Sequence, residues 1–297
     1  STLTLSGVTI QGGTINDGTV GGSGTVGGLG GVTPFGAIVV SGNSTIDDNA
    51  SLNKGAVTVN AGVTLILNNV AVTGSVITDA NAASSKLQID NGQTLTLSGV
   101  TIQGGTINDG TASGALGGTI VVAGSSTIDG NASLNNGGVT IDANQTLTLD
   151  NVAVTNTTFT DGTSVGASGG VLSVDAGDTL TLTGVVVEFG ELNIASGATL
   201  NLFDTTIVGV TLQDLGKINI FGSSTVDSFA SVFSGLTIVA TGQTLFLDNA
   251  FVTGTVTNHG TLQIDSGKSA TFSNVAVTGG TLDTSGTLEA QSGSSSI

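Results

Sequence analysis

Acidic side chains at three related turns are the groups of this sequence best suited to bind a metal ion. Asp47 and Asp48 lie in one turn, and its echoes at Asp129 and Asp227 follow after 82 and then 98 further residues. Calcium takes about six to eight oxygen ligands, of which one such turn supplies only a few. The sequence therefore leaves two interpretations open, a weak surface calcium site at each turn or aspartates that cap the turn by local hydrogen bonds.

These turns cannot combine into one calcium site, because about four repeats separate each from the next. The aspartate-rich repeat GGxGxDxUx of secreted calcium-binding solenoids is also missing, and the nearest string, at Gly12 and Gly13, has the wrong spacing. No other cofactor is indicated by the sequence.

A second acidic group could serve acid–base chemistry on a sugar. Glu188 and Glu191 flank one turn, and Asp204 and Asp214 follow in the next repeat. A glycosidase needs two carboxyl groups about 5–10 Å apart beside the sugar. The chain has no Trp, Tyr or Arg to hold a carbohydrate substrate. We therefore expect these residues to form a solvated acidic surface, and we expect the protein not to be an enzyme.

His259 and the threonine pairs offer little further chemistry. His259 is the single histidine, so it lacks the partners of a zinc site and is expected in an exposed turn. Threonines alternate with leucine at 2/4, 94/96, 146/148 and 179/181, as in surfaces that order water. The pairs do not recur in every repeat, which favours ordinary outward-facing strand residues.

Composition excludes several classes of protein. Acidic residues outnumber basic ones 21 to 4, giving a net charge of −17, so the basic surface of a nucleic-acid-binding protein is missing. There is no cysteine, and no apolar run reaches the roughly 18 residues of a membrane-spanning helix. We expect an extracellular bacterial protein that neither binds nucleic acid nor inserts into a membrane.

Internal repeats determine the expected architecture. The string TLTLSGVTIQGGTINDGT occurs at 2–19 and again at 94–111. The segment 36–75 is repeated at 118–157 and, more weakly, at 216–255. A shorter period of about 20 residues lies within these large repeats, and each short period contains two or three strand-like segments.

The short segments alternate apolar and polar residues with a period of two, which predicts β-strands. Strands this short are stable only when copies stack, so we predict an all-β fold, one continuous parallel β-solenoid over residues 1–297. We expect a right-handed helix of about 13 turns of roughly 19–25 residues, forming a rod about 60 Å long at the strand spacing of about 4.8 Å.

Three local features refine this expectation. The Gly-rich segment at about 20–35 contains the single proline and is predicted to be a loop insertion. Asparagines at positions 69, 151, 249 and 274 precede strands and are predicted to turn corners, with their side chains stacked. Nine of the ten phenylalanines follow residue 158, which predicts an aromatic core in the C-terminal half.

The repeated string at 2–19, with its variants at 146–163 and 271–288, resembles the β-strand-repeat regions of very large secreted bacterial adhesins and haemagglutinin-like surface proteins. The resemblance covers nearly the whole chain. It implies a parallel β-solenoid and a role in surface attachment, biofilm formation or cell contact. It brings no catalytic residues, because none belong to the repeat.

The sequence thus favours a structural protein, a rod-like stalk or filament subunit of a bacterial surface fibre. Neither end carries a polar cap, so end-to-end self-association is expected, and surface polysaccharide or another cell-surface protein are further candidate partners. Two alternatives remain open. One is a surface-layer subunit with lateral contacts through divalent cations, and the other is a β-helix that binds or cleaves carbohydrate.

Overall fold

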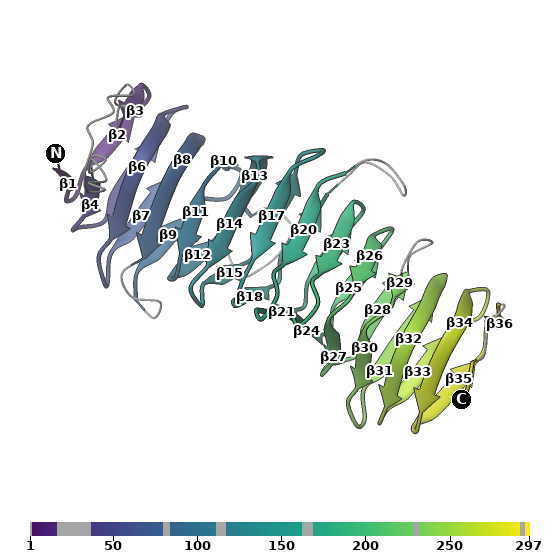
Figure 1. Ribbon diagram of the computed structural model, residues 1–297. Coiled ribbons are helices and arrows are strands. Elements are labelled where there is room, and N and C mark those ends of the chain that lie inside the picture. Colours follow the sequence, from purple (N-terminus) through teal and green to yellow (C-terminus); the bar gives the residue numbers. More distant parts are fainter. Residues whose placement is uncertain are drawn as a thin grey trace, which may run out of the picture.

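The computed structural model describes residues 2–16, 37–79, 84–110, 117–161, 169–227, 232–291 and 295–297. All regular secondary structure in these ranges is β-strand, and the strands pair in parallel. The chain winds into an elongated stack of turns with its two ends at opposite ends of the stack (Figure 1). The predicted parallel β-solenoid is therefore confirmed, while its handedness stays a prediction.

Each turn contributes a strand to each of three parallel ladders, which we call ladders 1, 2 and 3. Ladder 1 consists of β1 (Thr2–Leu5), β4 (Ala37–Val40), the second half of β6 (Ser51–Val59), the second half of β8 (Val70–Asp79), β11 (Thr101–Gln103), β14 (Ser126–Asp129), β17 (Thr146–Leu149), β20 (Val171–Val174), β23 (Glu191–Ile194), β26 (Thr211–Asp214), β29 (Val232–Phe233), the first half of β32 (Ala250–Asn258), the first half of β34 (Ser269–Thr278) and β36 (Thr287–Ala290).

Ladder 2 consists of β2 (Thr9–Gln11), β5 (Ser44–Asp47), β7 (Thr64–Leu67), β9 (Lys86–Gln88), β12 (Thr106–Asn108), β15 (Ser133–Asn135), β18 (Val152–Thr155), β21 (Thr179–Thr183), β24 (Thr199–Phe203), β27 (Lys217–Ile220), β30 (Leu236–Val239) and the second halves of β32 and β34.

Ladder 3 consists of β3 (Thr14–Asn16), the first halves of β6 and β8, β10 (Thr94–Ser98), β13 (Thr119–Gly124), β16 (Gly138–Ile141), β19 (Thr158–Thr160), β22 (Val186–Glu188), β25 (Thr206–Val208), β28 (Ser224–Asp227), β31 (Thr244–Asp248), β33 (Thr261–Ile264) and β35 (Thr281–Thr284).

Turn length follows from the register of paired residues. Thr244 pairs with Thr261, a turn of 17 residues, and Ser44 pairs with Leu65, a turn of 21. Turns that consist of described residues throughout fall between these two lengths, slightly shorter than the 19–25 residues expected. The described strands make about 13 turns, and at the usual strand spacing these stack to about 60 Å. The predicted loop at 20–35 lies outside the described residues.

The core is a continuous aliphatic column inside the three ladders. Leu95 and Leu97 of β10 are fully buried, while Thr94 and Thr96 between them point outward and remain partly exposed. The same alternation recurs along the rod and places buried Leu, Ile and Val from every ladder in one cluster. Burying each such side chain contributes about 1.5–3 kcal/mol, so the stacked turns supply the stability that single strands lack.

Corners between ladders use residues with positive φ. Asn69, Asn151, Asn249 and Asn274 have φ values of 53°, 55°, 55° and 56°, which asparagine tolerates better than most residues. Their predicted role at corners is confirmed. The predicted stacking of these asparagines is wrong, because Asn69 and Asn151 donate to Gln93 and Asp178 and lie on different ladders.

The phenylalanine prediction is also wrong. Among the described side chains, only Phe159 and Phe272 are buried in the core. Phe203 and Phe221 instead form an outward pair with ring centroids 5.4 Å apart, and Phe221 remains 45% exposed. A column of 17 to 21 residues per turn is filled mainly by aliphatic side chains, so most of the described phenylalanine rings lie outside it.

Candidate functional site

Identical motifs lie on different faces of the rod. The sequence Thr-Leu-Thr-Leu forms β10 in ladder 3, β17 in ladder 1 and β21 in ladder 2. The block beginning at β4 in ladder 1 is repeated from β13 in ladder 3, so the 82-residue repeat shifts by one face. The outward threonine pairs therefore build no single flat surface, which supports their interpretation as ordinary strand residues.

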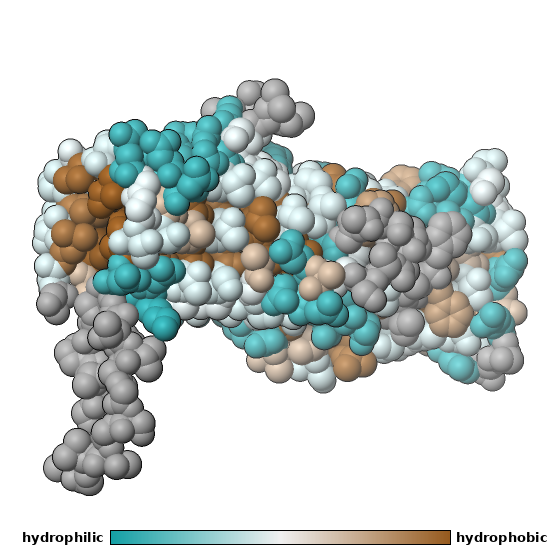
Figure 2. All heavy atoms as spheres, turned by 90° about the horizontal axis from the view of Figure 1, so that it is seen from above, coloured by the Kyte–Doolittle hydropathy of each residue, from teal (hydrophilic) through white to brown (hydrophobic). Residues whose placement is uncertain are grey.

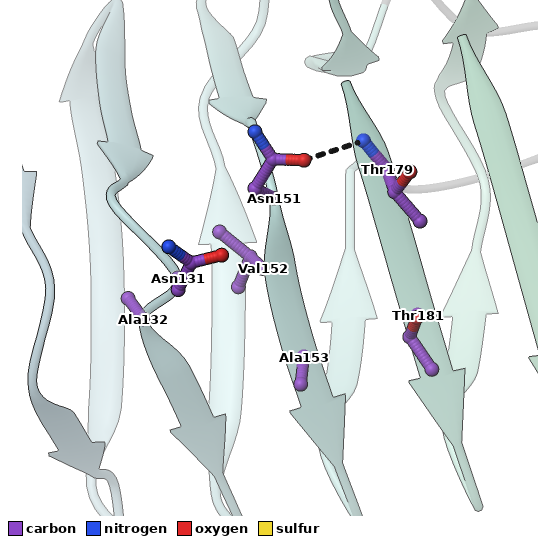
Figure 3. A pocket seen from close by; sticks show the side chains of 7 residues that line it. All are labelled: Asn131, Ala132, Asn151, Val152, Ala153, Thr179 and Thr181. Carbon is purple, nitrogen blue, oxygen red and sulfur yellow. Dashed lines mark hydrogen bonds between the residues drawn. The ribbon is translucent and has the colours of Figure 1, made fainter. Parts of the chain in front are cut away.

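The repeats form two copies of a shallow groove on the outer surface. Figure 3 shows one copy, in which asparagine, alanine and threonine side chains of three successive turns line the surface. The first groove is lined by Asn131, Ala132, Asn151, Val152, Ala153, Thr179 and Thr181, and the second by Asn49, Ala50, Asn69, Val70, Ala71, Thr94 and Thr96. Ala71 and Ala153 are exposed, so small side chains form the floor.

Asn151 and Asn69 already use both ends of their side chains. The Thr179 N–H donates to Asn151 Oδ1 at 3.1 Å, and Asn151 Nδ2 donates to Asp178 Oδ1. In the second groove, the Thr94 N–H donates to Asn69 Oδ1 at 3.2 Å. These contacts tie each corner to the next turn. The Thr181 hydroxyl accepts a hydrogen bond from Asn201 Nδ2 at 3.3 Å and can still donate its own proton to a ligand.

The calcium candidates lie on three different ladders. Asp47 ends β5 in ladder 2, Asp129 ends β14 in ladder 1 and Asp227 ends β28 in ladder 3, while Asp48 follows β5 with a φ of 58°. In the described part of the chain, no three His, Cys, Asp or Glu side chains come close enough to hold a metal ion. Weak calcium binding at a single turn stays a hypothesis.

Asp227 has protein partners of its own. Its Oδ2 lies 2.6 Å from Lys268 Nζ, and its Oδ1 accepts a hydrogen bond from Asn249 Nδ2 at 2.9 Å. Burial raises the pKa of Asp227, but the hydrogen bonds and the charge of Lys268 outweigh burial and hold the pKa below its ordinary value. A calcium ion at this turn would compete with the lysine.

Four other aspartates lie in the interior, which the sequence analysis missed. Asp109, Asp161 and Asp214 are fully buried and Asp79 is 6% exposed. Burial raises the pKa of Asp109 and Asp161 to about 8 and that of Asp79 and Asp214 to about 6. Hydrogen bonds to Asp79, Asp109 and Asp214 oppose this shift without cancelling it. The neutral carboxyl group is therefore favoured near neutral pH at Asp109 and Asp161, whereas Asp79 and Asp214 lose their protons at about pH 6.

Two of the buried aspartates pair through their backbone carbonyl with a glycine nine residues further along the chain. The Asp109 carbonyl accepts a hydrogen bond from the Gly118 N–H at 2.8 Å, and the Asp161 carbonyl accepts one from the Gly170 N–H. In the following turn, Gly137 with φ of 69° lies against Asp109, and a Cβ there would be 1.9 Å from the Asp109 carbonyl oxygen. The glycine is required because backbone and carboxyl group occupy the space of a side chain.

Asn258 is the neutral counterpart of these aspartates. It is 1% exposed, its Oδ1 accepts a hydrogen bond from the Gly260 N–H at 3.0 Å, and its Nδ2 donates to the Thr281 carbonyl at 2.9 Å. Asp214 accepts in the same way from the Gly216 N–H at 2.9 Å. The same corner thus accepts an amide or a carboxyl group.

The remaining acid–base candidates have mixed outcomes. His259 lies in an exposed turn before β33, as predicted. Glu188 ends β22 and Glu191 begins β23, so one corner with Phe189 at φ of 62° separates them. Asp204 occupies a corner with φ of 50°. The predicted solvated surface is wrong for Asp214, which points into the rod, because its hydrogen bond from Gly216 directs it inward.

Comparison with known proteins assigns the chain to no family. No family model matches the chain, and no curated protein sequence matches it. One solved structure, that of the TibC-catalysed hyper-glycosylated TibA fragment of residues 55–350, is similar over 99% of this chain and 93% of that fragment. The identity is 17% and the TM-score is 0.38. Within the described residues, no helix is long and apolar enough to cross a membrane.

Proposed function

We propose that this chain is a rod-like stalk or filament segment of an extracellular bacterial adhesin or surface fibre. The observation that carries the proposal is the continuity of the three ladders, which run from β1–β3 to β34–β36 around one aliphatic column. A load applied along such a rod is shared by parallel hydrogen bonds in every turn.

Surface charge and composition support the same role. A net charge of −17 keeps the outer faces soluble and opposes random association. The resemblance of the repeated strings to secreted adhesin repeats points to the same class. The chain would act by holding other parts of a fibre at a fixed distance from the cell.

A single-molecule pulling experiment tests the stalk proposal. The chain is tethered by its two ends, and a flexible Gly/Ser chain of equal length serves as the control. We expect the rod to keep a length of about 60 Å under low load and then to lose turns in steps. Continuous extension like that of the control would contradict a load-bearing role.

The duplicated groove favours a second candidate, weak binding of a surface polysaccharide. The two grooves share their alanine floor and threonine rim, which suits an extended polar chain better than a compact ligand. Titration of the protein with soluble bacterial polysaccharides, followed by NMR, tests this candidate. Shifts at Thr96 and Thr181 that vanish in the variants Thr96→Val and Thr181→Val would support it, and shifts spread evenly over all outward threonines would contradict it.

A further inference from the structure

Two exposed asparagines begin the same three-residue motif. The string Asn-Ala-Ser occurs at 49–51 and again at 131–133, at the same place in the 82-residue repeat. Asn-x-Ser or Asn-x-Thr, with any residue except proline at x, is the acceptor motif for N-linked sugars. In a chain rich in Asn, Ser and Thr such strings also arise by chance, so the structure must decide which of them are suited to carry a sugar.

The folded corner presents the reactive parts of this motif on the outside. Asn131 has a φ of 60° and an exposed side chain. Ala132 behind it is 1% exposed, and Ser133 begins β15 with its side chain facing outward. Asn49 has the same arrangement, with a φ of 58°, before the first half of β6. The buried alanine anchors the corner to the column, while the amide and the hydroxyl face solvent.

The corner one turn further on has a similar backbone but no motif. Ala153 pairs with Ser133, so Asn151 lies in the turn after Asn131. The side chain of Asn151 bonds to the next turn at both ends, whereas Asn131 forms no side-chain hydrogen bond in the part of the chain that the structure describes (Figure 3). The amide that the fold uses is therefore followed by alanine, and the amide that the fold leaves free is followed by serine.

The other groove shows the same contrast. Asn69 is bonded at both ends and Ala71 follows it, whereas Asn49 forms no side-chain hydrogen bond within the described ranges. At the equivalent position of the third, weaker repeat the sequence has Phe229. The Asn-Ala-Ser motif thus belongs to the two repeats that form the grooves.

The groove has room for a sugar attached to Asn131. Asn131 lines the groove on its first turn, the exposed Ala153 forms part of the floor, and Thr181 lies two turns further on, about 10 Å away at the usual strand spacing. The floor and rim that suit an extended polar chain would contact the first sugars of a glycan. Figure 2 shows one face of the rod, where hydrophilic patches and surface of intermediate hydropathy cover most of the length.

Three further strings of the acceptor type lie outside the two grooves, at Asn43, Asn144 and Asn156. Asn43 Oδ1 accepts a hydrogen bond from the Thr64 N–H at 2.9 Å. Asn156 packs over Gly184, where a Cβ would lie 2.8 Å from Asn156 Oδ1. Asn144 is exposed at a corner with a φ of 63° but lines neither groove. The argument from a free amide beside a groove therefore applies to Asn49 and Asn131.

We propose that Asn49 and Asn131 are N-glycosylation sites and that their glycans lie along the two grooves. The substrate is a sugar activated by a diphosphate at C1, and a separate glycosyltransferase catalyses the transfer. Asparagine Nδ2 forms a bond to C1 while the bond between C1 and the diphosphate oxygen breaks. The diphosphate leaves with the electron pair of that bond, and Nδ2 releases one proton to a base of the transferase. This modification is independent of the load-bearing role proposed above.

Mass spectrometry of the chain recovered from the cells that naturally produce it tests the proposal. A protease that cleaves at acidic residues yields the peptides, since the chain has only four lysines and no arginine. Electron-transfer fragmentation leaves the sugar on its residue, and we expect it on Asn49 and Asn131. Sugar already present on the intracellular chain would identify a nucleoside-diphosphate donor, and sugar present only on the exported chain would identify a polyprenyl-diphosphate donor. Both results support the shared chemistry.

Variants of Ser133 supply the matched controls. We expect Ser133→Ala to reduce the sugar on Asn131 to background without affecting Asn49, and Ser133→Thr to retain it. Neither change should disturb the fold, because Ala153 occupies the paired position in the next turn, and circular dichroism verifies this. An exported chain without sugar on Asn49 and Asn131, sugar on Asn131 that persists in Ser133→Ala, or sugar on hydroxyl groups alone would overturn the proposal. An unmodified rod that keeps its length under load would leave the stalk proposal intact.

Discussion

The corners at Asp161 and Asn258 have the same place in a turn but different chemistry. Each lies at the end of a strand and is fully or almost fully buried. Each also has a glycine with positive φ against it in the following turn, Gly190 or Gly280. Asn258 satisfies both ends of its amide, whereas the Asp161 carboxyl group has no hydrogen-bond partner among the described residues. Such a carboxyl group costs stability whenever it is ionised.

The choice between acid and amide does not follow from the place of the corner. Asp214, like Asn258, is followed after one residue by a glycine and the next strand, β27, so an acid also occupies a regular corner. Stability of the rod should depend on pH through the corners that carry a buried acid.

The largest expected effect is a loss of stability as pH rises. The pKa values of Asp79, Asp109, Asp161 and Asp214 are raised in the folded chain above the ordinary value of 3.8. Folding therefore retains protons that the unfolded chain releases between pH 4 and 8, and the free energy of unfolding falls over that interval. One pKa unit corresponds to about 1.4 kcal/mol, so each of these groups contributes a loss of a few kcal/mol. Urea denaturation at pH 4.5, 6 and 8 measures it, and a flat profile would contradict the buried acids.

A side chain at the corner glycine should be the next most damaging change. Gly137→Ala places a Cβ 1.9 Å from the Asp109 carbonyl oxygen at a φ of 69°. We expect a loss of about 3–5 kcal/mol in thermal or urea denaturation, as for overpacked sites with added backbone strain. Gly62→Ala is the matched control, since its φ is 76° but nothing lies within 4 Å. Equal losses in the two variants would contradict the close packing of this corner.

Exchange of acid and amide directly tests the comparison of corners. Asp161→Asn should raise the free energy of unfolding by about 1–3 kcal/mol at pH 8 and have a much smaller effect at pH 4.5, because only the ionised acid is penalised. Asn258→Asp should lower the free energy of unfolding at pH 8 and have a much smaller effect at pH 4.5. Asp142→Asn, at an exposed turn, is the control and should change little. A gain from Asp161→Asn that is the same at both pH values would contradict the account.

The smallest expected effect concerns the surface ion pair. Lys268→Ala removes the partner of Asp227 at a half-exposed site, for which about 0–1 kcal/mol is usual. The loss should shrink further at high salt. A loss of several kcal/mol in urea denaturation would show that this pair is a major structural contact.

The sequence predicted the architecture because the strands alternate with a period of two and the repeats are long. This alternation places Leu95 and Leu97 inside and Thr94 and Thr96 outside. The asparagines at the corners likewise follow from local chemistry. The face on which a repeat lies could not be predicted, because the three ladders accept the same strand sequence. That is why β10 and β17 share a motif but lie in different ladders.

The buried aspartates were missed because charged residues are normally expected on the surface. A usable signal was present. Asp109 and Asp161 each begin the string Asp-Gly-Thr directly after a strand, where a regular turn would have a corner. For the calcium candidates, the sequence suggested more than the structure supports. The repeated strings around Asp47, Asp129 and Asp227 suggested equivalent positions, whereas the three residues lie in different ladders and therefore on separate faces of the rod.

The most direct test of the central claim is the distance between the ends of a single chain. Nitroxide labels at Gln11→Cys and Asp283→Cys of one chain, diluted with unlabelled protein, report this distance by pulsed electron paramagnetic resonance. Twelve stacked turns predict one narrow distribution near 60 Å at the usual strand spacing. A broad distribution, or one centred far below that length, would contradict a continuous rigid rod.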